Sequence, residues 1–441
     1  MIIITAILIG LVLIVVFTSI LKYNTFLSIF AVSLLIALGT LPLQEVVPTI
    51  LTGFGNTMKS IGLIIIFGIM LGLILDKTHA TKSIAHAILK LTGKKNAGMA
   101  IHTTGFITGI PIFCDSGFIV LQGINKSLIE STGKPMIFMA SVLAAGLYSV
   151  HCLIPPHPGA TAAAGIMSAN IGHLILVGLP VAAISSVAGF LWVRFITRKD
   201  RIVPPIDNPN KKIQDETVEL PSAFRSFLPI IVPVLLLSGR SVLLLFAPKD
   251  QSYLLKIVSF LGEPIIALMI GILLAVTLYK KVNSKELNEL FDLSIERAGA
   301  ILAIVAAGGI FGTVIKATGI GEVAGIYLAS TGLGLCVPFL IAAFLKTAQG
   351  SSTVAVMTAA SIISPMLVSL NLNSDNGIVL ATLAMGAGSM FISHSNDAFF
   401  WVVTKFSDLE IKSTLRVWTT TTAVMGIFAF AAVWVFSLFM R

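Results

Sequence analysis

Two aspartates stand inside apolar stretches of this 441-residue chain. Asp115 lies in IFCDSGF and Asp397 lies in SHSNDAFFW. A carboxylate near the centre of a bilayer costs at least ~2.5 kcal/mol, so such residues normally serve ions, protons or substrates. The alternative is that both belong to loops outside the membrane. We predict that both lie at the site and that one of them carries a coupling proton.

One lysine, Lys346, is the only cation in a long apolar stretch, within AAFLKTAQGSS. It can pair with Asp397 or with Asp115, or contact an anionic substrate directly. A lysine of this kind can also extend its ammonium group to the membrane surface. We place Lys346 among the substrate-binding candidates.

Four histidines accompany these residues: His102, His151, His157 and His394. Histidine titrates near neutral pH and suits a proton relay. Isolated histidines are as often structural groups with satisfied hydrogen bonds. His157 and His394 are the stronger candidates for the site.

Small and polar residues cluster at the same places. They are Ser116, Gly117, Gln349, Gly350, Ser351, Ser352, Thr353, Ser393 and Asn396. Hydroxyls and amides both donate and accept hydrogen bonds, as a polyhydroxylated ligand requires. They also cap helices, and capping and ligand binding are compatible.

The elements that position these residues are membrane helices. The chain is 56% hydrophobic and 11% charged, with a mean hydropathy of +0.98. Apolar runs at both ends exceed the ~18 residues that cross a bilayer. No basic segment precedes the first run and Lys22 follows it, so we predict a membrane helix there and not a cleaved signal. The pattern predicts an all-α polytopic membrane protein.

Several function classes are disfavoured. The net charge of +9 comes from Lys and Arg in loops, which set membrane orientation and do not indicate nucleic acid binding. The three cysteines show no metal-ligand or disulfide spacing. HExxH, GxxxxGK[ST] and GxSxG motifs are absent. We therefore predict no enzyme, cofactor or metal, and transport driven by an ion gradient.

A polar linker at 197–225 divides the chain into a first membrane repeat, 1–196, and a second, 226–441. In each half an apolar run is interrupted twice, near 109–117 and 151–159 and again near 349–353 and 393–397. Matched broken segments are the sequence sign of a transporter built from repeats.

Loop charges constrain the topology. The basic clusters share one side if 97–129 and 333–369 are re-entrant hairpins. The halves are then inverted, about ten segments cross fully, and both termini face outward. Alternatively each hairpin arm crosses, which gives about fourteen crossings.

Broken helices carry the chemistry. Irregular backbone within the membrane is tolerated only where it is buried in protein or lines a wet cavity. Gly109, Gly117 and Gly350 permit tight turns, and the prolines of IPPHPG interrupt a helix. The freed helix N-termini present N–H groups and a positive dipole end, which suits a small carboxylate.

At these residues the chain resembles the gluconate:proton symporter (gluconate permease) family of the ion-transporter superfamily. The motifs are PIFCDSGFIVL, IPPHPGATA, AQGSSTVAVMTAASIISP and SHSNDAFFWVVTKF. The resemblance implies symport of gluconate or a related sugar acid with protons across a bacterial inner membrane. It also implies inverted repeats, elevator-like movement and, by analogy, a homodimer. Many members have a glutamate where this chain has Asp115, which leaves the particular acid open.

We therefore predict a proton symporter that imports a small sugar acid. Sodium coupling and a D-serine substrate are the nearer alternatives, and an anion channel is a more distant one.

Overall fold

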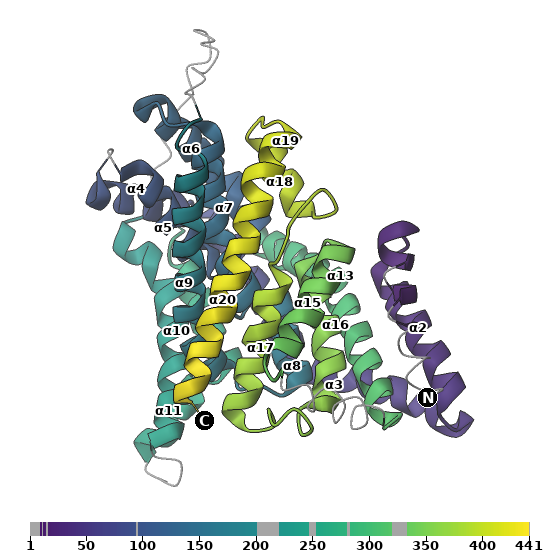
Figure 1. Ribbon diagram of the computed structural model, residues 1–441. Coiled ribbons are helices and arrows are strands. Elements are labelled where there is room, and N and C mark those ends of the chain that lie inside the picture. The colour runs from purple at the N-terminus through teal and green to yellow at the C-terminus, as the bar shows by residue number, and fades with distance from the viewer. Residues whose placement is uncertain are drawn as a thin grey trace.

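The computed structural model describes residues 9–10, 12–14, 16–93, 96–200, 220–246, 253–279, 283–319 and 333–440. The described residues form helices and connecting loops, without strands (Figure 1). Residues 1–8, 11 and 15 of the predicted first helix, and residues 201–219 of the predicted linker, lie outside them. The predicted all-α membrane fold is confirmed.

The first half contains η1 (Val16–Ile20), α2 (Thr25–Thr40), α3 (Leu43–Lys77), α4 (Ala80–Thr92), α5 (Ala97–Gly109), α6 (Cys114–Thr132), α7 (Met136–Leu153), α8 (Pro158–Met167) and α9 (Ile171–Ile196). The second half contains α10 (Ala223–Phe246), α11 (Tyr253–Leu261), α12 (Pro264–Val276), α13 (Ser284–Ala317), α15 (Cys336–Gln349), α16 (Ser352–Ile363), η3 (Ser364–Met366), α17 (Asp375–Ser389), α18 (Ala398–Phe406), α19 (Ile411–Thr414), η4 (Leu415–Thr419) and α20 (Thr420–Phe439). In both halves a pair of short helices is followed by an interrupted helix and then by a long one.

Six described helices are long and apolar enough to cross a membrane, or seven if α11 and α12 form one bent span. The first arms of the two hairpins are shorter, with 13 residues in α5 and 14 in α15. Such helices extend only ~20 Å, less than the ~30 Å hydrocarbon core. Their length favours re-entrant hairpins over arms that cross fully.

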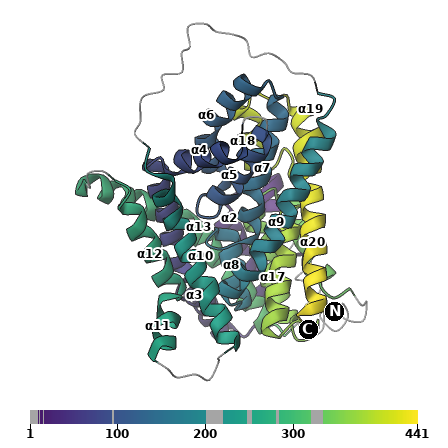
Figure 2. The ribbon, with the colours of Figure 1, turned by 90° about the vertical axis from the view of Figure 1, so that its left-hand side faces the viewer.

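The end of α6 and the start of α17 lie at opposite ends of the molecule (Figure 1). At one end, the side chain of Lys126 on α6 lies 3.5 Å from Asp408, which follows α18. At the other end, Asn376 at the start of α17 donates to the Met440 carbonyl, which follows α20. Figures 1 and 2 show α4, α18 and α19 near the first end and the end of α20 at the second. An inverted repeat requires this arrangement, and the repeat itself stays a prediction.

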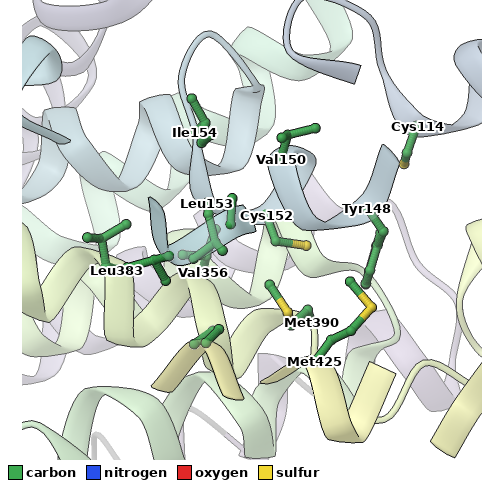
Figure 3. Close-up of a cluster of buried hydrophobic side chains, with 14 of the residues drawn as sticks. Cys114, Tyr148, Val150, Cys152, Leu153, Ile154, Val356, Leu383, Met390 and Met425 are labelled. Atoms are coloured by element: carbon green, nitrogen blue, oxygen red, sulfur yellow. The ribbon is translucent and has the colours of Figure 1, made fainter. Parts of the chain in front are cut away.

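Helix α7 forms the centre of the largest core. Nearly all of its residues are buried, so it is apolar on every side. Figure 3 shows Cys152 and Leu153 of α7 near Val356 of α16, Leu383 of α17 and Met390, which follows α17. The core therefore joins segments of both halves around the two hairpins.

The long helices α3 and α13 pack along each other and bound a second core. Gly53 and Gly309 allow the close approach, because a Cβ on Gly309 would overlap the Thr57 side chain. Small residues at membrane helix interfaces let backbones pack closely in this way. Of this pair, α13 also supplies one wall of the cavity described below.

Candidate functional site

Four helix N-termini converge on one cavity of about 360 Å³. The lining includes the first residues of α6 and α16 at the hairpin tips and of α8 and α18 at the interrupted helices. Each N-terminus leaves N–H groups without a partner inside its own helix and carries a partial positive charge. Four helix N-termini around one cavity create a local polarity that favours an anion.

In the first hairpin, α5 ends at Gly109 and α6 starts at Cys114. Pro111 lies in the turn, and the amide of Gly117 donates to the Phe113 carbonyl at 2.8 Å. Gly117 packs against α7, where a Cβ would overlap Leu147. Asp115 lies in the first turn of α6, where a carboxylate interacts favourably with the helix dipole.

The interrupted helix α7–α8 is joined to this hairpin by His157. The backbone of Ile154 is extended, and Pro158 begins α8. His157, the N-cap of α8, is 1% exposed, and its Nε2 lies 2.6 Å from the Gly109 carbonyl at the end of α5. The ring nitrogen must donate to that carbonyl, so His157 holds the hairpin tip against the break.

The second hairpin turns at Gly350, whose φ is +83°. That angle favours glycine, and a Cβ there would also overlap the Asn396 carbonyl. Ser351 caps α16, because its side chain accepts from the Val354 amide at 3.3 Å. The turn thus brings the N-terminus of α16 directly against the break between α17 and α18.

The same hairpin is bound to that break by two side chains. Asn396 donates to the Thr347 carbonyl at 2.9 Å, and Nε2 of His394 lies 3.1 Å from the same oxygen. Thr347 lies near the end of α15, as Gly109 lies at the end of α5. In both halves, side chains from the broken helix therefore contact a carbonyl of the neighbouring hairpin.

Lys346 and Asp397 form a buried ion pair with 2.7 Å between Nζ and Oδ2. The lysine side chain is 0% exposed, and its ammonium also donates to the Gly350 carbonyl. Asp397 caps α18 by accepting a hydrogen bond from the Phe399 amide at 3.1 Å, and it accepts a second hydrogen bond from the Ser393 hydroxyl. Of the three partners expected for Lys346, the structure shows Asp397.

Some of the predicted site residues line the cavity. They are Asp115, Gln349, Ser351, Ser352, Thr353, Asn396 and Asp397. Others lie behind the lining: Gly117, His157, Lys346, Gly350 and His394, while Ser116 lines a small adjoining cavity. The second group holds the turns and breaks in place.

Sequence reasoning missed part of the wall. Ile301 and Ile304 of α13 line the cavity, as do Phe113, Tyr148 and Phe399. The two isoleucines could not be predicted, because the sequence does not distinguish an apolar residue that faces lipid from one that faces a cavity. Tyr148 could have been found as a polar aromatic residue inside the apolar run AAGLYSV.

Several residues that line the cavity carry a buried polar atom with no hydrogen-bond partner within the described part of the chain. These atoms are Oδ1 of Asp115, Nδ1 of His151, and both side-chain atoms Oε1 and Nε2 of Gln349. Buried polar atoms are nearly always paired in folded proteins. Donors and acceptors left over at one cavity fit a ligand with several hydroxyl groups.

Among the described residues, no group of His, Cys, Asp and Glu is placed to hold a metal ion. Broken helices meet around one cavity that carries carboxylate, amide and hydroxyl groups, an arrangement typical of membrane permeases. Comparison with known proteins agrees with this class. The model of the GntP family permeases matches residues 1–439, and the chain belongs to that family.

Curated relatives match over nearly the whole length. The chain is 32% identical to the Gnt-II system L-idonate transporter of Escherichia coli, over 93% of this chain and 94% of the relative. It is 30% identical to the high-affinity gluconate transporter of E. coli, over 92% of each. The chain is therefore a multi-pass inner membrane permease and not an enzyme.

A solved structure has the same fold. The YdaH transporter of Alcanivorax borkumensis, described as having an unusual topology, superposes with a TM-score of 0.61 over 88% of each chain. Sequence identity is 16%, so this likeness concerns the fold alone.

Proposed function

We propose that the protein imports a small sugar acid, gluconate or a related aldonate or hydroxy acid, by proton symport. The observation that carries the proposal is the convergence of four helix N-termini on one cavity that also contains two carboxylates. The N-termini suit the carboxylate of the substrate. Asp115 and Asp397 are the candidates for the coupling proton.

The rest of the lining supports a hydroxylated substrate. Ser351, Ser352 and Thr353 offer hydroxyls, and Gln349 and Asn396 offer amides. A volume of about 360 Å³ lies within the range of small-molecule sites and suits a short acyclic acid. Relatives named for gluconate and L-idonate support the same substrate class.

The decisive experiment is uptake into proteoliposomes. We expect labelled gluconate to accumulate under an inside-alkaline pH gradient without sodium, and unlabelled aldonates to compete. Uptake that requires sodium would point to sodium coupling, and competition by D-serine alone would point to an amino-acid substrate. Absence of counterflow would indicate a channel, because only a carrier exchanges labelled for unlabelled substrate at an accelerated rate.

We also propose the arrangement in the membrane. Residues 1–196 and 226–441 would form two inverted repeats, joined by a cytoplasmic linker at 197–225, with both termini periplasmic and with a homodimer as the assembly. The basic residues near α4 and α19 support this orientation. Labelling of single cysteines at residues 210 and 441 from either side tests the orientation, and crosslinking in membranes tests the dimer.

A further inference from the structure

The two carboxylates at the cavity have different surroundings. Asp397 is engaged by the ammonium of Lys346 at 2.7 Å, by the Ser393 hydroxyl and by the Phe399 amide. Oδ1 of Asp115 is buried and has no hydrogen-bond partner in the described ranges. Asp397 is therefore the counter-ion of a buried cation, whereas Asp115 faces the cavity without one.

The other charged and titratable groups around Asp115 do not change this difference. Cys114, Tyr148 and His151 line the same cavity, and Cys152 lies on the next turn of α7. The residues of α13 that line the cavity are isoleucines. Arg297 and Asp76 line a separate small cavity that adjoins this one at Phe113. Lys346, on the second hairpin, is already paired with Asp397.

A substrate carboxylate in this cavity adds a second negative charge beside Asp115. Two like charges a few ångströms apart in a poorly solvated site repel strongly. Two carboxylates that share a site therefore do not both stay ionised. Ionised Asp115 and a bound sugar-acid anion thus oppose each other, whereas protonated Asp115 can donate a hydrogen bond to a substrate oxygen.

We propose that Asp115 alone carries the coupling proton, and that the Lys346–Asp397 pair keeps its charges throughout the transport cycle. This inference rests on the proposed function. Substrate binding and protonation of Asp115 favour each other, because linkage between two sites is reciprocal. One proton and one monovalent anion then move together, so the cargo carries no net charge.

The first test is proton uptake on binding. Purified protein in weakly buffered detergent solution receives gluconate while a pH indicator records proton exchange. We expect about one proton taken up per anion at alkaline pH, by reciprocal linkage, and none by Asp115→Asn. The double variant Lys346→Met/Asp397→Asn, which removes the ion pair as a unit, should still take up the proton wherever it binds gluconate.

The second test uses proteoliposomes. Counterflow by Asp115→Asn should no longer depend on pH, whatever the maximal rate of this variant. Under a pH gradient, its ratio of inside to outside gluconate should fall to unity. In the wild type, uptake should follow the pH difference and not an imposed membrane potential. Accumulation by Asp115→Asn, or proton uptake by that variant, would overturn the proposal.

Two further outcomes are decisive. A folded Asp115→Asn protein that binds no gluconate at any pH would also overturn it, because the proposal requires a neutral side chain to accept the anion. Should that variant not fold, Asp115→Ser provides a smaller neutral group for the same measurements. If the wild type itself shows no counterflow with any sugar acid, the proposed function fails and not the assignment of the proton.

Discussion

The ammonium of Lys346 lies 2.7 Å from the carboxylate of Asp397, and the two side chains are 0% and 7% exposed. The lysine lies in the last turn of α15, the first arm of the second hairpin, and the aspartate is the N-cap of α18, the second half of a broken helix. The pair therefore joins two irregular segments, the turn that follows α15 and the break that precedes α18. Burial makes each charge depend on the other, because an unpaired ion is costly in a poorly solvated interior.

We expect Asp397→Asn to destabilise the protein by about 3–5 kcal/mol, because it leaves a buried ammonium unpaired. Lys346→Met/Asp397→Asn should recover most of that loss, which a double-mutant cycle of thermal unfolding in detergent measures. The exposed pair Lys126–Asp408 provides the control, with side chains 42% and 82% exposed. Asp408→Asn should cost less than about 1 kcal/mol. Additive effects of the Lys346 and Asp397 changes would contradict the pairing.

Gly350→Ala should destabilise the second hairpin by about 1–3 kcal/mol and abolish uptake, because the residue has a positive φ and contacts the Asn396 backbone. Gly239 in α10 is the matched control, since a Cβ there meets no atom within 4 Å. Gly239→Ala should be neutral or stabilise by about 0.5–1 kcal/mol, as in other helices. Thermal unfolding and uptake of both variants test the contrast, and equal behaviour would refute it.

Gln349→Leu should leave the substrate-free protein no less stable, because it removes two buried polar atoms that have no partner. Gluconate affinity should fall about 10–100-fold, as expected when one or two hydrogen bonds to a ligand are lost. By contrast, Gln122→Leu removes a bond to the Phe406 carbonyl at 2.9 Å and should cost about 1–3 kcal/mol of stability. Binding calorimetry and thermal unfolding separate the two results. Unchanged affinity in Gln349→Leu would remove that residue from the site.

His157 offers a test of structural against relay roles. Its Nε2 contacts the Gly109 carbonyl, so His157→Phe leaves that carbonyl unpaired at a cost of about 1–3 kcal/mol. His157→Gln keeps a donor and should retain proton-driven accumulation in proteoliposomes. If His157 carried protons, glutamine would fail as completely as phenylalanine, and that result would reassign the residue.

The helix interruptions could be predicted from the sequence because the residues that cause them lie within the interruptions themselves. Glycine at Gly350 and the prolines before α8 interrupt a helix whatever surrounds them. The clustering of Gln349, Asn396 and Asp397 at one cavity followed from two breaks in matched positions. The all-helical membrane fold followed from hydropathy alone.

Contacts between residues far apart in the sequence could not be predicted in this way. Lys346 had three plausible partners in the sequence, and only the folded backbone places its ammonium on Asp397 and away from the cavity. His157 was a candidate ligand from its place in the sequence, and only the fold shows that its Nε2 contacts the Gly109 carbonyl at the end of α5. Ile304 belongs to the wall because α13 packs beside the hairpins, and nothing in its own segment marks it.

We propose that the cavity favours anions through the N-terminal ends of α6, α8, α16 and α18, since no lysine or arginine lines it among the described residues. A polarity fixed in the backbone survives replacement of any single side chain. Mutation along the wall can therefore alter which acid fits, by shape and hydroxyl pattern, without abolishing the preference for a carboxylate. Such a scaffold can acquire a new substrate through a few substitutions while it remains an anion carrier at every step.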